Sequence, residues 1–407
     1  MATPAQRTNT WTLDEWYDQS VAGTTGGYQW GTKLWSWGYN REGSLGLNGN
    51  NTSFNRSSPT QVGTNADWKW IGGLTGYNLF AGKKDGSMWA WGKNEQGMAG
   101  YNLAPSGGQR SSPVQIGTET TWKYAAAGSY GSLALKTDGT IWSCGYNFEG
   151  ILGLNQNLGR ISSPTQIGTD TNWKQIDVGL QNFGGIKTDG TLWMWGTGSA
   201  LMWVTNSNAM RSSPTQMPGT TWKKCAFGKY TGAGIKTDGT LWMWGDNGQG
   251  TLGLNKAAPS ASGASSPIQV GTNTNWDNIT LNFGGDWRRV LATKTDGTLW
   301  SWGSAGVGMM GLNDGSPAVR RSSPTQIPGT WATAVPGVFD NSEAETISPE
   351  DVTTAKKADG NYYVWGRGVT YGGLGLNDKV SRSSPTQLPG TWVVIKGGYG
   401  SGHALKD

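Results

Sequence analysis

The stretch KTDGTLWMWG, from Lys187 to Gly196, decides the fold of this chain because it recurs almost unchanged. It returns as KTDGTLWMWG from Lys236 and as KTDGTLWSWG from Lys294. Asp-Gly between two apolar runs predicts a β-hairpin, and we expect a two-residue turn of the primed type, with positive φ at both central residues. Alternate residues of the LWMWG strand point to opposite faces, and both faces are apolar. The strand is therefore predicted to be buried on both sides, as in small sheets packed face to face.

Three sequence markers recur with a period of roughly 50 residues. The Asp-Gly hairpin occurs at Asp85, Asp138, Asp189, Asp238, Asp296 and Asp359. The Ser-Ser-Pro marker starts at Ser57, Ser111, Ser162, Ser212, Ser265, Ser322 and Ser383. The Trp-Gly marker lies at Trp37, Trp91, Trp195, Trp244, Trp302 and Trp365, and Cys144 takes the remaining place. Each unit holds about four short strands, which is the size of a propeller blade. For one blade we expect strands near 184–188, 191–196, 215–217 and 222–227.

The two ends of the chain supply the missing hairpin. The chain ends in Gly-His-Ala-Leu-Lys-Asp, the first half of a hairpin unit, and residues 31–38 match the second half. Both ends then share one sheet, which requires a closed ring because an open solenoid holds its ends apart. We therefore predict an all-β, seven-bladed β-propeller over residues 31–407, closed by pairing of the N- and C-terminal strands with Leu34 beside Leu405. Residues 1–30 form a short N-terminal arm.

The repeat resembles that of the regulator of chromosome condensation family, which forms seven-bladed propellers. The motifs that carry the resemblance are Gly402-His403-Ala404-Leu405, Asp138-Gly139, Trp37-Gly38-Tyr39-Asn40 and Leu45-Gly46-Leu47. It covers residues 31–407, and the Trp-Lys and Ser-Ser-Pro-Thr-Gln elements look like the bacterial and phage-encoded members. The resemblance implies the fold and says little about function, because one propeller scaffold serves many unrelated functions.

Composition excludes several classes of partner. Only 14% of the residues are charged and 66 of 407 are glycine, which suits strands and tight turns. The net charge of +5 is mild and no block of Lys or Arg occurs, so no nucleic acid partner is expected. No apolar run reaches about 18 residues, so no membrane insertion is expected. No signal peptide is visible at the N-terminus. The two cysteines, Cys144 and Cys225, are predicted to be buried free thiols.

The N-terminal arm contains one predicted helix. Thr12 is a candidate N-cap with Glu15 three residues on, which is a capping-box pattern. A single helix this short does not persist alone in water, so it must dock, either on the rim of the propeller or on a partner. The candidate contact residues are Trp11, Leu13, Trp16 and Tyr17.

The repeat departs from itself at 197–209, 256–264, 286–289 and 335–354. Insertions in repeat proteins lie on loops and often carry the specific contacts. The first and third departures contain the apolar candidates Met202, Trp203 and Trp287. The fourth contains the acidic candidates Asp340, Glu343, Glu345, Glu350 and Asp351 and no Lys or Arg. A solvated acidic loop and a contact with a partner or a cation are both open interpretations.

Arginine precedes most of the Ser-Ser-Pro markers. It does so at Arg56, Arg110, Arg211, Arg321 and Arg382, with Arg160 one place earlier and Ala264 breaking the series. The period places these guanidinium groups on one face of the propeller. One hypothesis pairs each with a loop carbonyl or carboxylate of the next blade. The other makes them an anion-facing ring.

The sequence does not predict an enzyme. It has one histidine, His403, and no His-based triad, metal-ligand spacing or phosphate loop, so we expect no catalytic, cofactor or metal site. The leading hypothesis is a non-enzymatic structural or binding protein. More narrowly, we expect a bacteriophage virion component that decorates a capsid or tail, or belongs to a fibre, and contacts other virion proteins through the arm. The alternatives are an adhesin for a host glycan or receptor, a protein inhibitor, and a guanine nucleotide exchange factor-like protein. The expected location is the virion, with extracellular and cytoplasmic locations as alternatives.

Overall fold

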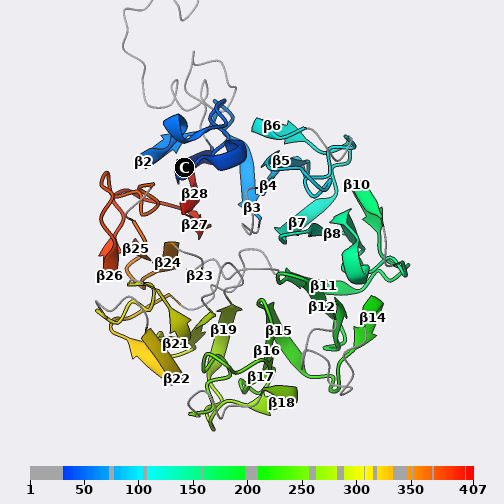
Figure 1. The fold of residues 1–407 in the computed structure, drawn as a ribbon, viewed down its shortest axis with the longest axis vertical. Helices are drawn as coiled ribbons and strands as arrows, with labels where there is room; N and C mark the ends of the chain where they lie inside the picture. Colours follow the sequence, from blue (N-terminus) through cyan, green and yellow to red (C-terminus); the bar gives the residue numbers. More distant parts are fainter. Residues whose placement is uncertain are drawn as a thin grey trace, which may run out of the picture.

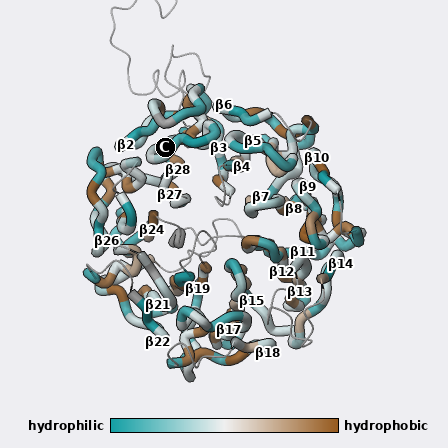
Figure 2. Tube along the Cα trace, viewed as in Figure 1, coloured by the Kyte–Doolittle hydropathy of each residue, from teal (hydrophilic) through white to brown (hydrophobic). Residues whose placement is uncertain are grey.

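The computed structural model describes residues 31–72, 78–103, 108–156, 159–197, 210–255, 263–281, 288–306, 308–314, 319–332, 347–349, 352–368, 371–398 and 400–407. These residues form seven four-stranded antiparallel sheets arranged around a central axis (Figure 1). The predicted all-β, seven-bladed propeller is therefore confirmed. Figure 2 shows hydrophilic and hydrophobic segments interleaved around the whole ring, as expected when every blade repeats one pattern.

Each blade is numbered by the position of its innermost strand along the chain, and its strands follow from the axis outward. Blade 1 contains β3 (Trp68–Ile71), β4 (Asn78–Lys83), β5 (Met88–Gly92) and β6 (Arg110–Gln115). Blade 2 contains β7 (Trp122–Ala127), β8 (Gly131–Lys136), β9 (Ile141–Tyr146) and β10 (Arg160–Gln166). Blade 3 contains β11 (Trp173–Val178), β12 (Asn182–Lys187), β13 (Leu192–Gly196) and β14 (Arg211–Gln216). Blade 4 contains β15 (Trp222–Phe227), β16 (Thr231–Lys236), β17 (Leu241–Gly245) and β18 (Ala264–Gln269).

The remaining blades follow the same order. Blade 5 contains β19 (Trp276–Leu281), β20 (Arg289–Lys294), β21 (Leu299–Ala305) and β22 (Val319–Ile327). Blade 6 contains β23 (Ile347–Pro349), β24 (Val352–Lys356), β25 (Tyr362–Gly366) and β26 (Arg382–Gln387). Blade 7 contains β27 (Val394–Gly397), β28 (Ser401–Lys406), β1 (Lys33–Gly38) and β2 (Arg56–Gln61). Three short 3-10 helices lie in loops, at η2 (Arg41–Gly43), η3 (Thr52–Phe54) and η4 (Phe148–Gly150).

Blade 7 closes the ring with strands from both ends of the described chain. Strands β1 and β28 pair antiparallel, with Leu34 opposite Leu405 and Ser36 opposite His403. Both leucines are fully buried. At the tip of this hairpin, the Thr32 hydroxyl donates a hydrogen bond of 2.8 Å to Asp407 Oδ1. The closure predicted from the split hairpin unit is therefore confirmed.

The Asp-Gly turn differs from the prediction. In blade 3 the Gly190 N–H donates to the Lys187 carbonyl and the Lys187 N–H donates to the Thr191 carbonyl, so three residues form the loop. Only the glycine takes positive φ, at 78°. The expected two-residue primed turn is wrong, and the loop is instead a type I turn followed by a glycine bulge. The cause is the Asp189 side chain, which accepts the Thr191 N–H at 2.9 Å and holds the aspartate in an ordinary backbone conformation.

The outermost strand of each blade also differs from the prediction. In blade 3, β14 begins at Arg211, whereas the sequence placed it near residue 215. The register between β13 and β14 shifts between Met194 and Gly196, opposite the Ser-Ser-Pro marker. Proline lacks an N–H donor and is tolerated on an edge strand beside such an irregularity. The marker is therefore part of the strand.

The fourth departure from the repeat is shorter than predicted. Ile347–Pro349 and Val352–Lys356 are strands β23 and β24 of blade 6, so the prediction of an irregular segment over the whole of 335–354 is wrong. Trp331 forms an isolated bridge with Lys357, and Ala332 donates to the Lys356 carbonyl. Two segments that are far apart in the chain, residues 331–332 and β23, thus pair along the inner side of blade 6. Ala264 and Arg289, assigned to other departures, are the first residues of β18 and β20.

Neighbouring blades are held together by the tryptophans of the Trp-Gly marker. All six are fully buried, and five donate their indole N–H to a loop carbonyl of the preceding blade, at 2.8–3.1 Å. These five are Trp37, Trp91, Trp195, Trp302 and Trp365. In blade 2, Cys144 Sγ faces the corresponding carbonyl, that of Met98, at 3.5 Å. The indoles fill the seams between blades, which explains why both faces of the predicted strand are apolar.

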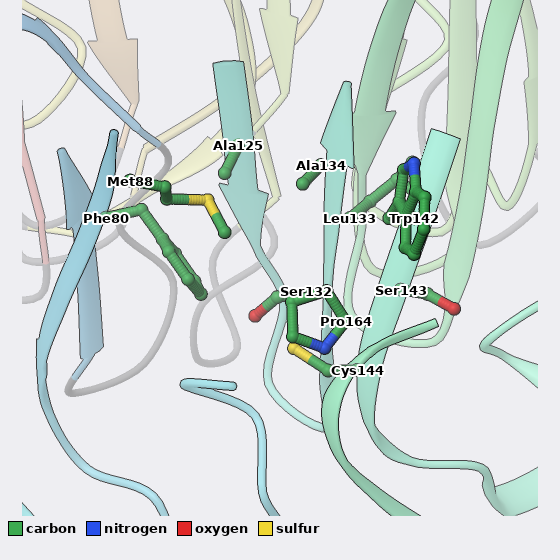
Figure 3. A pocket seen from close by; sticks show the side chains of 10 residues that line it. All are labelled: Phe80, Met88, Ala125, Ser132, Leu133, Ala134, Trp142, Ser143, Cys144 and Pro164. Atoms are coloured by element: carbon green, nitrogen blue, oxygen red, sulfur yellow. The ribbon is translucent and has the colours of Figure 1, made fainter. Parts of the chain in front are cut away.

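The cysteine in blade 2 leaves a small cavity (Figure 3). Its volume is about 10 Å³, close to what one water molecule needs, and Cys144, Phe80, Met88 and Pro164 are among the lining residues. In Figure 3, Phe80 and Met88 come from blade 1 and Cys144 and Pro164 from blade 2, so the cavity lies between the two blades. Cys144 and Cys225 are both buried free thiols, as predicted.

Candidate functional site

The antiparallel topology gives the propeller two different ends. The Asp-Gly turns between the second and third strands of each blade lie at one end, which we call the hairpin face. The connections from first to second strand and from third to fourth strand lie at the other end, which we call the loop face. The chemistry of the two faces differs, and that difference locates the candidate site.

On the hairpin face, blades 1 to 5 carry the same hydrogen-bonded chain. A Ser or Thr hydroxyl donates to Oδ1 of the turn aspartate at 2.6–2.7 Å and accepts the indole N–H of the next strand's tryptophan at 2.8–2.9 Å. The hydroxyls belong to Ser87, Thr140, Thr191, Thr240 and Thr298. Hydrogen bonds from these residues hold the pKa of each aspartate below its usual value. The aspartates are thus ionised turn residues, which does not suit a general acid.

A lysine in every blade lies over two aromatic rings on the same face. In blade 2, Lys136 Nζ is 3.7 Å from the Trp142 ring centroid and 4.7 Å from that of Trp122. The equivalent lysines are Lys83, Lys187, Lys236, Lys294, Lys357 and Lys406. Such cation–π pairs stabilise the blade ends. This role of the lysines was not predicted from the sequence, although a lysine stands two residues before every turn aspartate.

On the loop face, the Leu-Gly-Leu-Asn motif joins each blade to the next. Its last residue takes positive φ of 55–62° and donates its N–H, at 2.6–2.8 Å, to the first serine carbonyl of the next Ser-Ser-Pro marker. Among the described residues, this hydrogen bond occurs at six interfaces between blades, through Asn48, Asn102, Asn155, Asn255, Asn313 and Asn377. Asparagine tolerates this backbone conformation better than most residues. The motif is therefore structural.

The arginines that precede the markers lie at or near the start of the outermost strands, and the loop face carries them in a ring. Among the described residues, the partners of five of these arginines lie in the same blade as the arginine, so the expected pairing with the next blade is wrong for Arg56, Arg110, Arg160, Arg321 and Arg382. Arg382 Nη2 contacts Asp378 at 2.5 Å and Arg321 Nη2 contacts both oxygens of Asp314 at 3.2–3.3 Å. The cause is the return of each loop, which brings its residues beside the first residue of the outermost strand.

The ring is not uniform. In blades 7, 1 and 2 the arginine lies over an aromatic ring of its own blade: Arg56 over Phe54 at 6.0 Å, Arg110 over Tyr101 at 5.8 Å, and Arg160 over Tyr146, the last residue of β9, at 5.5 Å. In blades 5 and 6 it pairs with a carboxylate. Cation–π stacking orients a guanidinium group without neutralising its charge. Positive charge is therefore retained in one sector of the loop face and balanced in another.

Exposed apolar side chains gather beside the charged sector. Tyr130, Phe148 and Met210 are 37%, 39% and 46% exposed. Phe148 stacks on Tyr146 with ring centroids 5.8 Å apart. Phe148 and Gly150 lie in the 3-10 helix η4, and a Cβ added at Gly150 would meet Ser212. Helix η4 therefore lies against blade 3 beside Ser212, which is two residues after Met210 in the sequence. Aromatic and methionine side chains are enriched in protein interfaces, so this patch is a candidate contact surface.

Arg288, one of the residues of the third departure, joins two blades on the loop face. Its guanidinium forms an ion pair with Asp246 and lies 4.8 Å from the Tyr230 ring centroid. Both partners belong to blade 4, whereas Arg288 precedes the second strand of blade 5. Burial holds the pKa of Arg288 below its usual value. This part of the departure is a contact between blades.

The described residues near the axis provide no acid–base pair with catalytic geometry. His403 is fully buried, its Nε2 is 3.3 Å from the Ser401 hydroxyl, and burial lowers its pKa to about 3. Asp177 accepts the Phe227 N–H of the next blade at 2.7 Å, and burial raises its pKa to about 7. Gln175 bridges the same two strands through the backbone of Cys225. Gln175 and Asp177 thus link the innermost strands β11 and β15, whereas His403 lies in β28, the second strand of blade 7. Asp177 was not predicted from the sequence because no repeat marker points to it.

All the predicted contact residues lie outside the described residues. They are Trp11, Leu13, Trp16, Tyr17, Met202, Trp203, Trp287, Asp340, Glu343, Glu345, Glu350 and Asp351. They stay predictions. The aromatic partners Phe54, Tyr101 and Tyr146 were missed, and one signal was available: Tyr101 replaces the second leucine of a Leu-Gly-Leu-Asn motif.

Comparison with known proteins agrees with this geometry. A profile of the regulator of chromosome condensation (RCC1) repeat matches residues 122–151, which run from β7 to the residue after η4. The ultraviolet-B receptor UVR8 of Arabidopsis thaliana is 24% identical over 357 residues, which cover 86% of this chain and 76% of that protein.

Solved structures extend the likeness to almost the whole chain. Prp20p of Saccharomyces cerevisiae superposes with a TM-score of 0.75 at 20% identity, covering 92% of this chain and 91% of its own. Human WBSCR16 superposes with a TM-score of 0.74 at 17% identity, covering 92% of this chain and 99% of its own. At these identities the superpositions concern the fold alone. With seven blades and closure through β1 and β28, the chain is a seven-bladed β-propeller, and its residues 122–151 match the RCC1 repeat.

Proposed function

We propose that this protein is a non-enzymatic binding protein that recognises another macromolecule with its loop face. The observation that carries the proposal is the contrast between the two faces. The Asp-Gly turn is alike from blade to blade, whereas the connections at the loop face differ in length. The connection from the first to the second strand runs from Ala127 to Gly131 in blade 2 and from Leu281 to Arg289 in blade 5. In repeat proteins, the face that accumulates length changes is commonly the binding face.

The chemistry of the loop face supports the same proposal. It carries exposed Tyr130 and Phe148 and three arginines stacked on aromatic rings, the residue types that dominate protein–protein contacts. Two structures of the similar yeast protein Prp20 are described by protein partners: one by its binding to Gsp1p and histones, the other by its complex with Kap60. A protein partner for this chain is consistent with both.

The narrower proposal is that the partner belongs to a bacteriophage particle. It is supported by the sequence: the arm at 1–30 lies outside the repeat and has a helix pattern suited to docking. Deleting residues 1–30 should release the protein from particles purified on a density gradient while its thermal unfolding stays unchanged. A truncated protein that still sedimented with particles would remove the arm from the proposal.

Site-specific photocrosslinking tests the use of the loop face. Benzoylphenylalanine at Phe148 is expected to capture one defined protein in the cells that produce this chain. The matched control is the same amino acid at Thr188, which is exposed on the hairpin face. Capture from Thr188 and none from Phe148 would refute the assignment of the binding face. A glycan array with the intact protein separates the adhesin alternative, which requires bound glycans.

A further inference from the structure

We propose that the loop face of blades 7, 1 and 2 binds an acidic polypeptide segment through Arg56, Arg110 and Arg160. This inference rests on the proposed function and names the chemistry of the partner. The three guanidinium groups begin the outermost strands of three consecutive blades, so they follow one arc of the ring. Arg56 and Arg110 are partly exposed, and Arg160 is exposed.

Among the described residues, an aromatic ring orients each of the three arginines and no carboxylate forms an ion pair with it. The aromatic rings of Phe54, Tyr101 and Tyr146 lie 5.5–6.0 Å from the guanidinium carbons. Arg56 and Arg110 also donate one hydrogen bond each to the carbonyl of the preceding residue, at 3.0 and 3.3 Å. A guanidinium group has five N–H donors, so each of these two arginines keeps most of its donors for a ligand. A stacked arginine loses less side-chain entropy when it binds, because the ring already limits its rotamers.

The other half of the ring provides the contrast. Asp314 and Asp378 take the corresponding place beside Arg321 and Arg382, and each forms an ion pair. The chain therefore balances the guanidinium charge in blades 5 and 6 with carboxylates from the same loops. If the arginines served only to anchor their loops, either kind of partner would suffice in every blade. Retained charge in three adjacent blades points to an external anion.

The three blades form a continuous surface at this end. A Cβ added at Gly43, in the loop of blade 7, would meet Ser111 and the Arg110 carbonyl of blade 1. A Cβ added at Gly97, in blade 1, would meet Ser162 of blade 2. Because each loop lies directly against the next marker, an extended ligand can follow the arc without crossing a gap.

The other charges of the sector favour a polypeptide over a nucleic acid. Glu42 and Glu95 lie in the same loops and pair with Arg41 and Lys93, at 3.6 and 2.8 Å, and Glu149 lies in η4. A nucleic acid strand has a phosphate at every nucleotide and would meet these carboxylates. A polypeptide can place separate carboxylates opposite the arginines, where the guanidinium fork matches their geometry. Exposed Phe148 offers an apolar contact that a polypeptide can use.

The test measures the binding of defined probes to the full chain by fluorescence anisotropy. The probe is labelled poly-L-glutamate of about 20 residues at about 0.1 M ionic strength, where the Debye length of about 10 Å limits the effect of remote charges. The variant R110Q/R160Q should weaken binding about ten-fold, as two exposed charge pairs allow. The matched control R321Q/R382Q also removes two charges and should change affinity less than about two-fold, because those groups are already paired.

Three outcomes overturn the proposal. They are no binding of poly-L-glutamate to the unchanged protein, equal losses in both variants, and tighter binding of oligothymidylate of the same length than of poly-L-glutamate. Thermal unfolding of both variants, expected within about 2 °C of the parent, separates lost binding from lost folding. Crosslinks from benzoylphenylalanine at Phe148 that persist in R110Q/R160Q would refute binding of an acidic segment by these arginines. They would still support binding of a partner by the loop face.

Discussion

Replacing Thr240 with valine tests whether the hydroxyl chain on the hairpin face stabilises the blades. Thr240 is 7% exposed, donates to Asp238 Oδ1 at 2.6 Å and accepts the Trp242 indole N–H at 2.8 Å. Valine has nearly the same shape and keeps the backbone hydrogen bond to Asp238, so the change removes only the hydroxyl. A bond to a carboxylate contributes about 1.5–3 kcal/mol and one between neutral groups about 1 kcal/mol, and solvent at this surface reduces both. We expect a loss of about 2 kcal/mol in the free energy of unfolding.

The assay is urea unfolding followed by circular dichroism, with a double-mutant cycle that adds Trp242→Phe. The coupling between the two substitutions should be about 0.5–1 kcal/mol, because the indole N–H loses its acceptor in either case. The effect of Thr240→Val should shrink below about pH 4. The pKa of Asp238 is lowered in the folded protein by its bonds to Thr240, so this stabilisation is present above the unfolded value and lost as the pH falls through the folded value.

Blade 6 supplies the reverse experiment. Asn361 and Tyr363 occupy the positions of the hydroxyl residue and the tryptophan, and Asn361 donates only its backbone N–H to Asp359. The substitutions Asn361→Thr and Tyr363→Trp would introduce the hydroxyl and the indole N–H of this hydrogen-bonded series into blade 6, and should raise the free energy of unfolding by about 1 kcal/mol. If Thr240→Val costs less than about 0.5 kcal/mol and the reverse substitutions add nothing, hydroxyl bonding is not what stabilises this face.

Three further predictions concern Leu405, Cys144 and Asp177. Leu405→Ala should cost about 2–5 kcal/mol in urea unfolding, since this fully buried side chain lies in the strand that closes the ring; a cost below about 1 kcal/mol would contradict ring closure as a source of stability. Cys144→Trp should lower the melting temperature although it restores the repeat residue, because the cavity of about 10 Å³ cannot hold an indole. Adding Phe80→Ala to this variant should recover part of the lost melting temperature. A higher melting temperature for Cys144→Trp alone would be evidence against this packing. Asp177→Asn should raise the melting temperature at about pH 8 and leave it unchanged at about pH 4. The pKa of Asp177 is raised to about 7 in the folded protein, so the stability contributed by its protonated form is lost as the pH rises from about 4 through 7. Equal effects at both pH values would exclude this titration.

The sequence alone determined the number of blades, their order and the closure of the ring. Those properties follow from spacing: markers that recur at a constant period must take equivalent positions, and half a hairpin at each end must be completed by the other half. The tertiary structure decided which groups meet within each repeat. Arg160 and Arg382 stand near the same marker, yet one stacks on Tyr146 and the other pairs with Asp378, because the partner depends on how each loop returns to its strand. The turn type depended likewise on the Asp189 side chain, and the cavity beside Cys144 on the Phe80 ring of the neighbouring blade. A period specifies equivalent backbone positions, whereas side-chain partners are selected by contacts between segments far apart in the chain, which no spacing encodes.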